Sequence, residues 1–225
     1  MARGIFVTGT DTGVGKTAVA AALLRALVAV GARAVGMKPV AAGLAQDDDV
    51  DPDVRSLMCA GNVVAPLRDI NPYAFALPIA PHLAARAAGT IIDLDRIAAA
   101  YARLASMSDA VVVEGAGGVL VPLAPGADML DIPRSLGLPV LLVVGMRLGC
   151  LNHALLSASA IRARGLRLAG WVANRIDPAM LEGDANVEAL DERLSAPLLC
   201  ELAWRPAGCA LPDIGCTALS LLGLR

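Results

Sequence analysis

The stretch Gly9-Thr10-Asp11-Thr12-Gly13-Val14-Gly15-Lys16-Thr17 follows a short apolar run and precedes an alanine- and leucine-rich segment with helical spacing. Strand, glycine-rich loop and helix, in this order, let backbone N–H groups and a helix N-terminus hold the phosphates of a nucleoside triphosphate. Lys16 is expected to reach the β- and γ-phosphates, and the Thr17 hydroxyl to ligate Mg²⁺. Five residues separate Gly9 from Gly15 where the usual motif has four, so we interpret a variant phosphate loop; the alternative is a Gly/Lys/Thr cluster in an ordinary turn.

Lysine is scarce in this chain, which has 19 basic residues but only two lysines, Lys16 and Lys38. An ammonium is a compact point charge on a flexible stem, whereas a guanidinium is a broad planar fork. Lys38 ends the apolar run 34–37, and the carboxyl ends of parallel strands are where α/β enzymes hold ligands. We therefore expect Lys38 to share the ligand site with Lys16; the alternative is a chance surface lysine.

Apolar, β-branched runs alternate with helical patterns along the whole chain. The predicted strands are 4–8, 34–38, 110–114, 140–144, 168–174 and 198–202, and the predicted helices are 16–30, 53–60, 93–106, 152–164 and 187–194. Asp93 is a plausible N-cap, and Gly31 and Gly165 are plausible helix stops. Near-continuous apolar strands with helical crossovers predict an α/β fold: a mostly parallel sheet with helices on both faces, P-loop NTPase-like, in a single domain over residues 1–225.

Composition limits the classes of protein that the chain can belong to. The hydrophobic fraction is 56% and the net charge is −2, which provides for a substantial core and argues against nucleic-acid binding through bulk charge. The longest apolar runs are too short to span a bilayer, the N-terminus lacks a signal-peptide layout, and the five cysteines have no metal-binding spacing. We predict a cytoplasmic protein, with no membrane or nucleic-acid partner and with an exposed acidic loop over residues 45–53.

Three further segments carry groups suited to a nucleotide enzyme. Glu114 ends the third predicted strand and could hold Mg²⁺, and Gly115-Ala116-Gly117-Gly118 behind it would let the backbone approach a ligand. Asn174 ends another strand, and its amide can both donate and accept as adenine recognition requires; the alternative is a turn-forming Asn. Gly149-Cys150-Leu151-Asn152-His153 opens a helix whose N–H groups could bind a carboxylate; the alternative is an Asn cap with a surface His.

Together these segments resemble the dethiobiotin synthetase family, whose loop has the same five-residue spacing. The resemblance is carried, in the family's order, by residues 6–17, Lys38-Pro39-Val40, Asn71-Pro72-Tyr73-Ala74-Phe75, residues 113–118, residues 148–153 and residues 169–174. It implies an ATP-dependent carboxylase and cyclo-ligase domain that turns 7,8-diaminononanoate, CO₂ and MgATP into dethiobiotin, ADP and phosphate, a step of biotin biosynthesis.

The resemblance also implies roles for individual residues. The catalytic residues would be Lys38, Lys16 and Thr12, and the Mg²⁺ ligands Thr17, Asp53 and Glu114. The nucleotide would be bound by Gly13, Val14, Gly15, Lys16, Thr17, Ala18, Asp53, Glu114, Gly115, Ala116, Gly117, Asn174 and Arg175. The substrate would be bound by Ala42 and, across a homodimer interface, by Gly149, Cys150, Leu151 and Asn152. Ala42 and Ala80 stand where many members have a serine.

Three alternative functions are weighed against this one. A partner-regulated switch ATPase of the partition and division type has a signature lysine near the start of its loop, where this chain has Asp11. An amidoligase would need an ammonia-producing domain, for which 225 residues leave no room. A non-catalytic nucleotide-binding module would give Lys38 and residues 114–118 no purpose.

Overall fold

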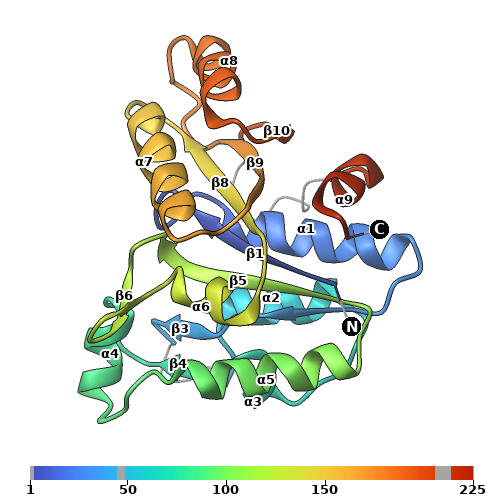
Figure 1. Cartoon of the computed structure of the whole chain (residues 1–225), viewed down its shortest axis with the longest axis vertical. Coiled ribbons are helices and arrows are strands. Elements are labelled where there is room, and N and C mark those ends of the chain that lie inside the picture. The colour runs from blue at the N-terminus through green and yellow to red at the C-terminus, as the bar shows by residue number, and fades with distance from the viewer. Residues whose placement is uncertain (1–2, 45–48, 206–213, 225) are drawn as a thin grey trace.

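The computed structural model describes residues 3–44, 49–205 and 214–224 (Figure 1). Within these ranges one parallel sheet has the strand order β10-β9-β8-β1-β5-β2. Its strands are β1 (Arg3–Gly9), β2 (Ala34–Met37), β5 (Ala110–Gly118), β8 (Val140–Met146), β9 (Leu168–Arg175) and β10 (Leu198–Leu202). All six were predicted, and the predicted α/β fold is confirmed.

Helices cover both faces of this sheet because its strands bury alternate residues on opposite sides. Ile5 and Val7 of β1 pack with α1 (Lys16–Ala29) and α9 (Cys216–Leu222), whereas Phe6 packs on the other face. That second face is covered by α5 (Leu94–Ser106), α6 (Asp131–Leu136), α7 (Cys150–Ala163) and α8 (Gly183–Leu194). The helix α2 (Pro52–Ala60) contributes to both cores. Two apolar layers therefore fix the direction of β1 and of the loop behind it.

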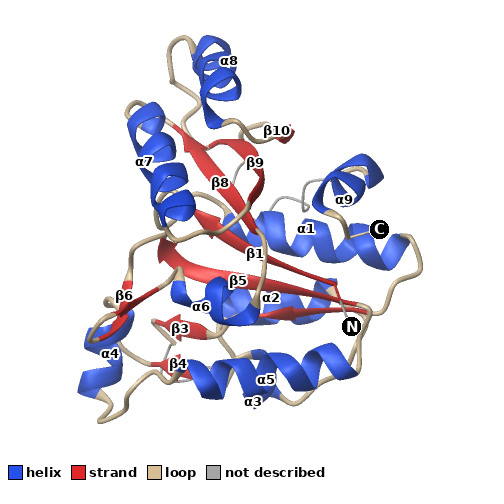
Figure 2. Ribbon diagram, in the orientation of Figure 1, coloured by secondary structure: helices blue, strands red, loops and turns tan. Residues whose placement is uncertain are grey.

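Several short elements were not predicted. The strands β3 (Val40–Ala42) and β4 (Tyr73–Phe75) pair in parallel, and β6 (Pro122–Ala124) pairs antiparallel with β7 (Ala127–Asp128). The helices α3 (Leu67–Ile70) and α4 (Pro81–Ala87) are also short. Figure 2 shows β3, β4, β6 and α4 grouped at one end of the molecule. Strands of two or three residues give no readable alternation of apolar and polar residues, so sequence reasoning missed them.

The predicted end of the third strand was wrong. β5 runs on through the glycines to Gly118, although the predicted strand ended at Glu114. The register with β1 shifts after the Val7–Glu114 pair, so that Gly9 pairs with Gly118, and Gly117 takes a positive φ of 64° in this irregular stretch. Such an irregularity lets a strand continue while its backbone bends.

Some of the predicted helix boundaries are confirmed and others were wrong. Asp93 caps α5 by accepting a bond from the Asp95 N–H, and Gly31 and Gly165 have the left-handed conformation of helix stops. By contrast, α7 begins two residues before the predicted start, and α8 four residues before it. Of the expected acidic loop, residues 45–48 lie outside the described residues, while Asp53 belongs to α2. In the part of the chain that the structure describes, no helix is long and apolar enough to cross a membrane.

Candidate functional site

The variant phosphate loop connects β1 directly to α1. Gly13 and Gly15 have positive φ angles of 75° and 93°, a conformation that favours glycine. A Cβ atom on Gly15 would lie 2.2 Å from Asn174 Nδ2, so a side chain there would collide with its neighbour. Gly15 is also the N-cap of α1, and among the described residues no side chain caps this helix. The N–H groups of its first turn are therefore available to an anion.

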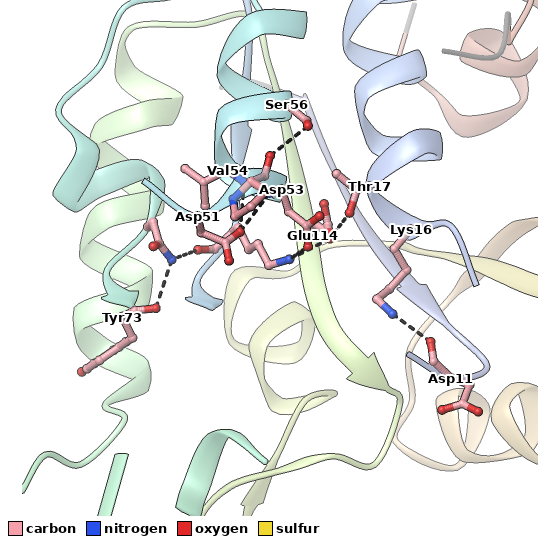
Figure 3. Close-up of polar contacts among 12 residues, drawn as sticks. Asp11, Lys16, Thr17, Asp51, Asp53, Val54, Ser56, Tyr73 and Glu114 are labelled. Atoms are coloured by element: carbon pink, nitrogen blue, oxygen red, sulfur yellow. Dashed lines mark hydrogen bonds and ion pairs between the residues drawn. The ribbon is translucent and has the colours of Figure 1, made fainter. Parts of the chain in front are cut away.

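Lys16 and Lys38 line the same cavity, which has a volume of about 710 Å³. Lys16 Nζ donates to the Asp11 carbonyl at 2.8 Å, as Figure 3 shows. Lys38 Nζ donates to Asp53 and, at 3.1 Å, to Glu114 Oε1. The exposed fractions of the two lysines are only 7% and 6%. Two buried ammonium groups thus face one space, as the scarcity of lysine suggested.

The environments of the two ammonium groups shift their pKa values in opposite directions. Burial lowers the pKa of Lys16, and the nearby Lys38 adds to this effect, while Glu114 opposes it. For Lys38, burial acts in the same direction, but Glu114 and Asp53 outweigh it and raise the pKa. Lys38 therefore stays positively charged in the buried site.

Glu114 is the most enclosed acid of the cavity, with an exposed fraction of 1%. Its Oε1 accepts bonds from Thr17 Oγ1 at 2.9 Å and from Lys38, whereas its Oε2 has no hydrogen-bond partner among the described residues. Burial raises the pKa of Glu114, and Lys38 works against that rise. An unpartnered buried oxygen is costly unless something else binds it.

The oxygen atoms around Glu114 fit a magnesium ion. Thr17 offers a hydroxyl, and Asp53 a carboxylate on the first turn of α2. Mg²⁺ is usually held by one or two carboxylates together with substrate phosphates, not by a cage of protein ligands. Among the described residues, no group of three or more His, Cys, Asp or Glu could hold a metal ion.

Most of the predicted site residues meet at this cavity. Those that line it are Thr12, Gly13, Gly15, Lys16, Thr17, Lys38, Ala42, Asp53, Glu114, Ala116 and Gly117. Its other lining residues, which were not predicted as site residues, are Asp51, Pro78, Ile79, Ala80, Pro81 and Val121. Asp51 accepts bonds from the backbone N–H groups of Asp53 and Val54, and so caps α2 and sets the direction of Asp53. Aspartate followed by proline is a typical helix start, which is the signal that could have identified Asp51.

The remaining predicted nucleotide residues do not line the cavity. Asn174 Nδ2 donates to the Val14 carbonyl at 2.8 Å and thereby holds the loop from β9. Arg175 pairs with Asp184 and, at 2.8 Å, with Glu201. Ala18 lies half-buried in α1, and Gly115 is buried in β5, where a Cβ would lie 2.8 Å from Phe6 Cζ.

The predicted substrate residues of α7 are also outside this cavity. None of Gly149, Cys150, Leu151 and Asn152 is among its described lining residues. Gly149 caps α7 with a φ of 95°, and, within the described ranges, no side chain bonds to the first turn. The Cys150 N–H donates to the Arg147 carbonyl at 3.0 Å, so the N–H groups that this helix start can offer to an anion are those of Leu151 and Asn152.

Comparisons with known proteins agree on one family. A family model described as "AAA domain" matches residues 3–208. The chain is 57% identical over 199 residues to the ATP-dependent dethiobiotin synthetase BioD of Nitrosospira multiformis, covering 88% of this chain and 87% of that protein. It is 53% identical to the protein of the same name from Aromatoleum aromaticum, with 88% of each chain covered.

The fold itself is similar to that of solved ATPases. The septum site-determining protein MinD of Pyrococcus horikoshii, in complex with Mg-ADP, matches with a TM-score of 0.57 at 20% identity, over 92% of this chain and 83% of that one. A ParA family ATPase from Chlorobium tepidum matches with a TM-score of 0.57 at 12% identity, over 99% and 93%. At these identities the likeness concerns the fold alone.

Proposed function

The chain belongs to the ATP-dependent dethiobiotin synthetase family, and from this premise we propose that it converts 7,8-diaminononanoate, CO₂ and MgATP into dethiobiotin, ADP and phosphate. The observation that supports this chemistry best is the shared cavity of Lys16 and Lys38 beside the phosphate loop. A reaction that brings a carboxylated amine and a triphosphate together needs fixed positive charge at their meeting point.

The proposed reaction has three steps. An amine of the substrate attacks CO₂ and loses a proton, which gives a carbamate. A carbamate oxygen attacks the γ-phosphorus, and ADP leaves with the electrons of the broken P–O bond. The second amine then attacks the carbon of this mixed anhydride, closes the ureido ring, and expels phosphate.

In the second step two anions must approach each other, and Lys16 and Lys38 would neutralise them. Without fixed cations the repulsion would amount to several kcal/mol in a dry site. Thr12 lines the same cavity and would lie near the reacting groups. Phosphoryl transfer depends mainly on such positioning and charge stabilisation.

We propose that Thr17, Asp53 and Glu114 hold Mg²⁺. When bound, the ion would neutralise the phosphate oxygens. The unpartnered Oε2 of Glu114 supports this assignment, because an oxygen buried at such cost needs a partner. In the structure Lys38 bonds both carboxylates, which keeps them close to the hydroxyl of Thr17.

For the nucleotide, the loop backbone from Gly13 to Ala18 would hold the phosphates, with residues 114–117 on the opposite wall. Asn174 donates one N–H of its side-chain amide to the Val14 carbonyl. The second N–H and the oxygen of this amide are left to bind adenine. Arg175 is fixed by two acids and would support the same side of the base.

For the second substrate, Ala42 contributes an apolar wall of the cavity without a hydroxyl group. The start of α7 lies outside the cavity of its own chain, so we propose that it binds the substrate carboxylate in a homodimer, where the partner subunit would present it. The single-domain organisation over residues 1–225 and the cytoplasmic location stay predictions.

The decisive experiment incubates the protein with diaminononanoate, [¹³C]bicarbonate and MgATP, and detects dethiobiotin by mass. The label should enter the ureido carbon, and omission of any component should stop product formation. ATP hydrolysis that proceeds without diaminononanoate and yields no labelled product would instead favour a switch ATPase.

Loss of Lys38 tests the central role directly. We expect Lys38→Ala to lower kcat on the order of 100-fold, with a much smaller change in the affinity for ATP, because the lost charge acts mainly where the two anions meet. Steady-state kinetics and calorimetric nucleotide binding measure the two quantities. Equal losses in both, or no loss, would refute the proposed role.

A further inference from the structure

Arg147 links the two helix starts at which anions are proposed to bind. It lies in the turn between β8 and α7, two residues before Gly149. One of its guanidinium nitrogens lies 2.6 Å from Asp11 Oδ2 in the phosphate loop. Segments 136 positions apart in the sequence are thus joined by one ion pair.

Asp11 uses each of its acceptor groups for a different purpose. Its carbonyl accepts from Lys16 at 2.8 Å, its Oδ1 accepts from the Thr12 N–H at 2.7 Å, and its Oδ2 pairs with Arg147. Figure 3 shows the carbonyl facing Lys16 while the carboxylate points away from it. The bond from Thr12 is the largest cause that lowers the pKa of Asp11, and Arg147 adds to it. The residue therefore carries a negative charge within the loop that is proposed to bind a triphosphate.

We infer that Arg147 is a positioning residue that neutralises Asp11, so that anions can bind both at the phosphate loop and at the start of α7. The inference rests on the proposed function, since that function places the triphosphate and the substrate carboxylate on the two sides of Asp11. The sequence motifs predicted neither a positioning role for Arg147 nor a need to neutralise Asp11.

The solvent exposure of the Arg147–Asp11 ion pair indicates that the pair affects ligand binding more than folding stability. The exposed fractions of the two side chains are 41% for Arg147 and 49% for Asp11. Ion pairs this accessible to water contribute little to folding stability. Removal of the arginine alone would, however, leave an uncompensated carboxylate beside the two proposed anion sites, and its repulsion would weaken the binding of anions at both.

The test is a double-mutant cycle with Arg147→Gln and Asp11→Asn. Asparagine keeps the Oδ1 acceptor for the Thr12 N–H, removes the charge, and replaces the Oδ2 acceptor of Arg147 by an NH₂ donor. We expect Arg147→Gln to raise KM for MgATP and for diaminononanoate about tenfold with little change in kcat. Asp11→Asn should change both KM values about twofold at most, and the double variant should return them toward the wild type. Arg147→Lys should rescue most of the loss.

Controls separate neutralisation from a structural role. Arg193→Gln breaks an exposed pair with Glu192 on α8 and should leave all kinetic constants unchanged. Melting temperatures of the variants should agree with that of the wild type within a few degrees. Additive effects in the cycle, or KM values that do not respond to Arg147→Gln, would overturn the inference.

A second readout keeps this test independent of the overall reaction. Calorimetric binding of MgADP should show the same non-additive pattern as KM for MgATP. If the wild type forms no dethiobiotin, the proposed function fails, and the nucleotide cycle still decides whether Arg147 neutralises Asp11. A cycle that is additive in MgADP binding overturns the inference even if dethiobiotin is made.

Discussion

The starts of α1 and α7 are built alike and equipped differently. Both helices have 14 residues, begin after a left-handed glycine, and have no acid in the first turn and no side-chain cap within the described residues. By contrast, α2 and α5 begin with the aspartate caps Asp51 and Asp93. The chain thus satisfies N–H groups at the starts of α2 and α5 with its own side chains, whereas α1 and α7, like α3, α4, α6, α8 and α9, have no side-chain cap in the part of the chain that the structure describes. Of these uncapped helices α1 and α7 are the longest, and N–H groups of their first turns are available to anions.

What differs is the charge placed beside these N–H groups. α1 begins with Lys16 and Thr17, which face the cavity with Lys38 and Glu114, whereas α7 begins with Cys150 and Leu151. A multiply charged phosphate chain needs a lysine and a metal ion, while a single carboxylate can be held by backbone N–H groups and the helix dipole. The same local geometry can therefore serve ligands of different charge.

The largest expected effect comes from changing the cation of α1 while its charge is kept. Lys16→Arg should lower turnover on the order of 100-fold, because a planar fork cannot replace a compact ammonium in a buried position. Steady-state dethiobiotin formation measures it. Wild-type turnover in this variant would show that any cation suffices at the start of α1, and that the scarcity of lysine in the chain does not indicate a functional role for Lys16.

The two cap glycines offer a second test. Gly15→Ala adds a Cβ that would lie 2.2 Å from Asn174 Nδ2 at a φ of 93°, whereas the nearest atom to a Cβ on Gly149 is His153 Cε1 at 3.8 Å. We expect Gly15→Ala to weaken nucleotide binding about tenfold and to lower the free energy of unfolding by about 3 kcal/mol. Gly149→Ala should cost only about 1 kcal/mol from backbone strain.

Urea unfolding and calorimetric MgADP binding distinguish these two variants. Equal losses of stability would mean that backbone conformation, and not the contact with Asn174, makes Gly15 necessary. In that case the two helix starts would be more alike than the structure indicates.

A new acid at the start of α7 probes its own ligand. Asn152→Asp should raise KM for diaminononanoate about threefold, since a carboxylate in the first turn weakens the hold of a helix start on an anion. KM for MgATP should not change. Asn152→Ser, which adds no charge, is the matched control. An equal rise of both KM values would show that α7 does not act on the substrate separately from α1.

The comparison also explains what could be predicted from the sequence. The phosphate loop and the strands around it follow from long apolar runs and a rigid glycine pattern, and Lys38 could be placed because lysine is rare here. Pro78, Ile79 and Val121 line the cavity but lie in the segments that connect short elements, before α4 and before β6, and the position of these segments depends on tertiary packing. No local pattern signals that, so they were missed.

Glu114 shows a different limit. Its place beside the phosphate loop was predicted, but not the continuation of β5 through the following glycines, because glycine disfavours strand interiors and only pairing with β1 maintains the strand. Likewise, the ion pair of Asp11 with Arg147 joins two loops through the fold. Neither residue alone indicates its partner.

The smallest expected effect concerns the cost of burying Lys16. Its pKa is lowered by burial and by Lys38, so the folded state holds this proton less tightly than the unfolded state does. At neutral pH the charged lysine therefore destabilises the fold, and this cost begins to fall as the pH rises through the lowered pKa and is gone above the ordinary lysine pKa of the unfolded state. Cys150, the matching residue of α7, is also buried. Without nucleotide, Lys16→Met should thus be more stable than the wild type by about 1 kcal/mol at pH 7, and the urea midpoints of the two proteins should converge toward pH 10.

The control is Arg25→Met, at an exposed position of α1, whose urea midpoint should show no such convergence with that of the wild type. A less stable Lys16→Met at pH 7 would mean that the bond from Lys16 to Asp11 outweighs desolvation, and that the helix start built for the triphosphate is not strained by its own lysine.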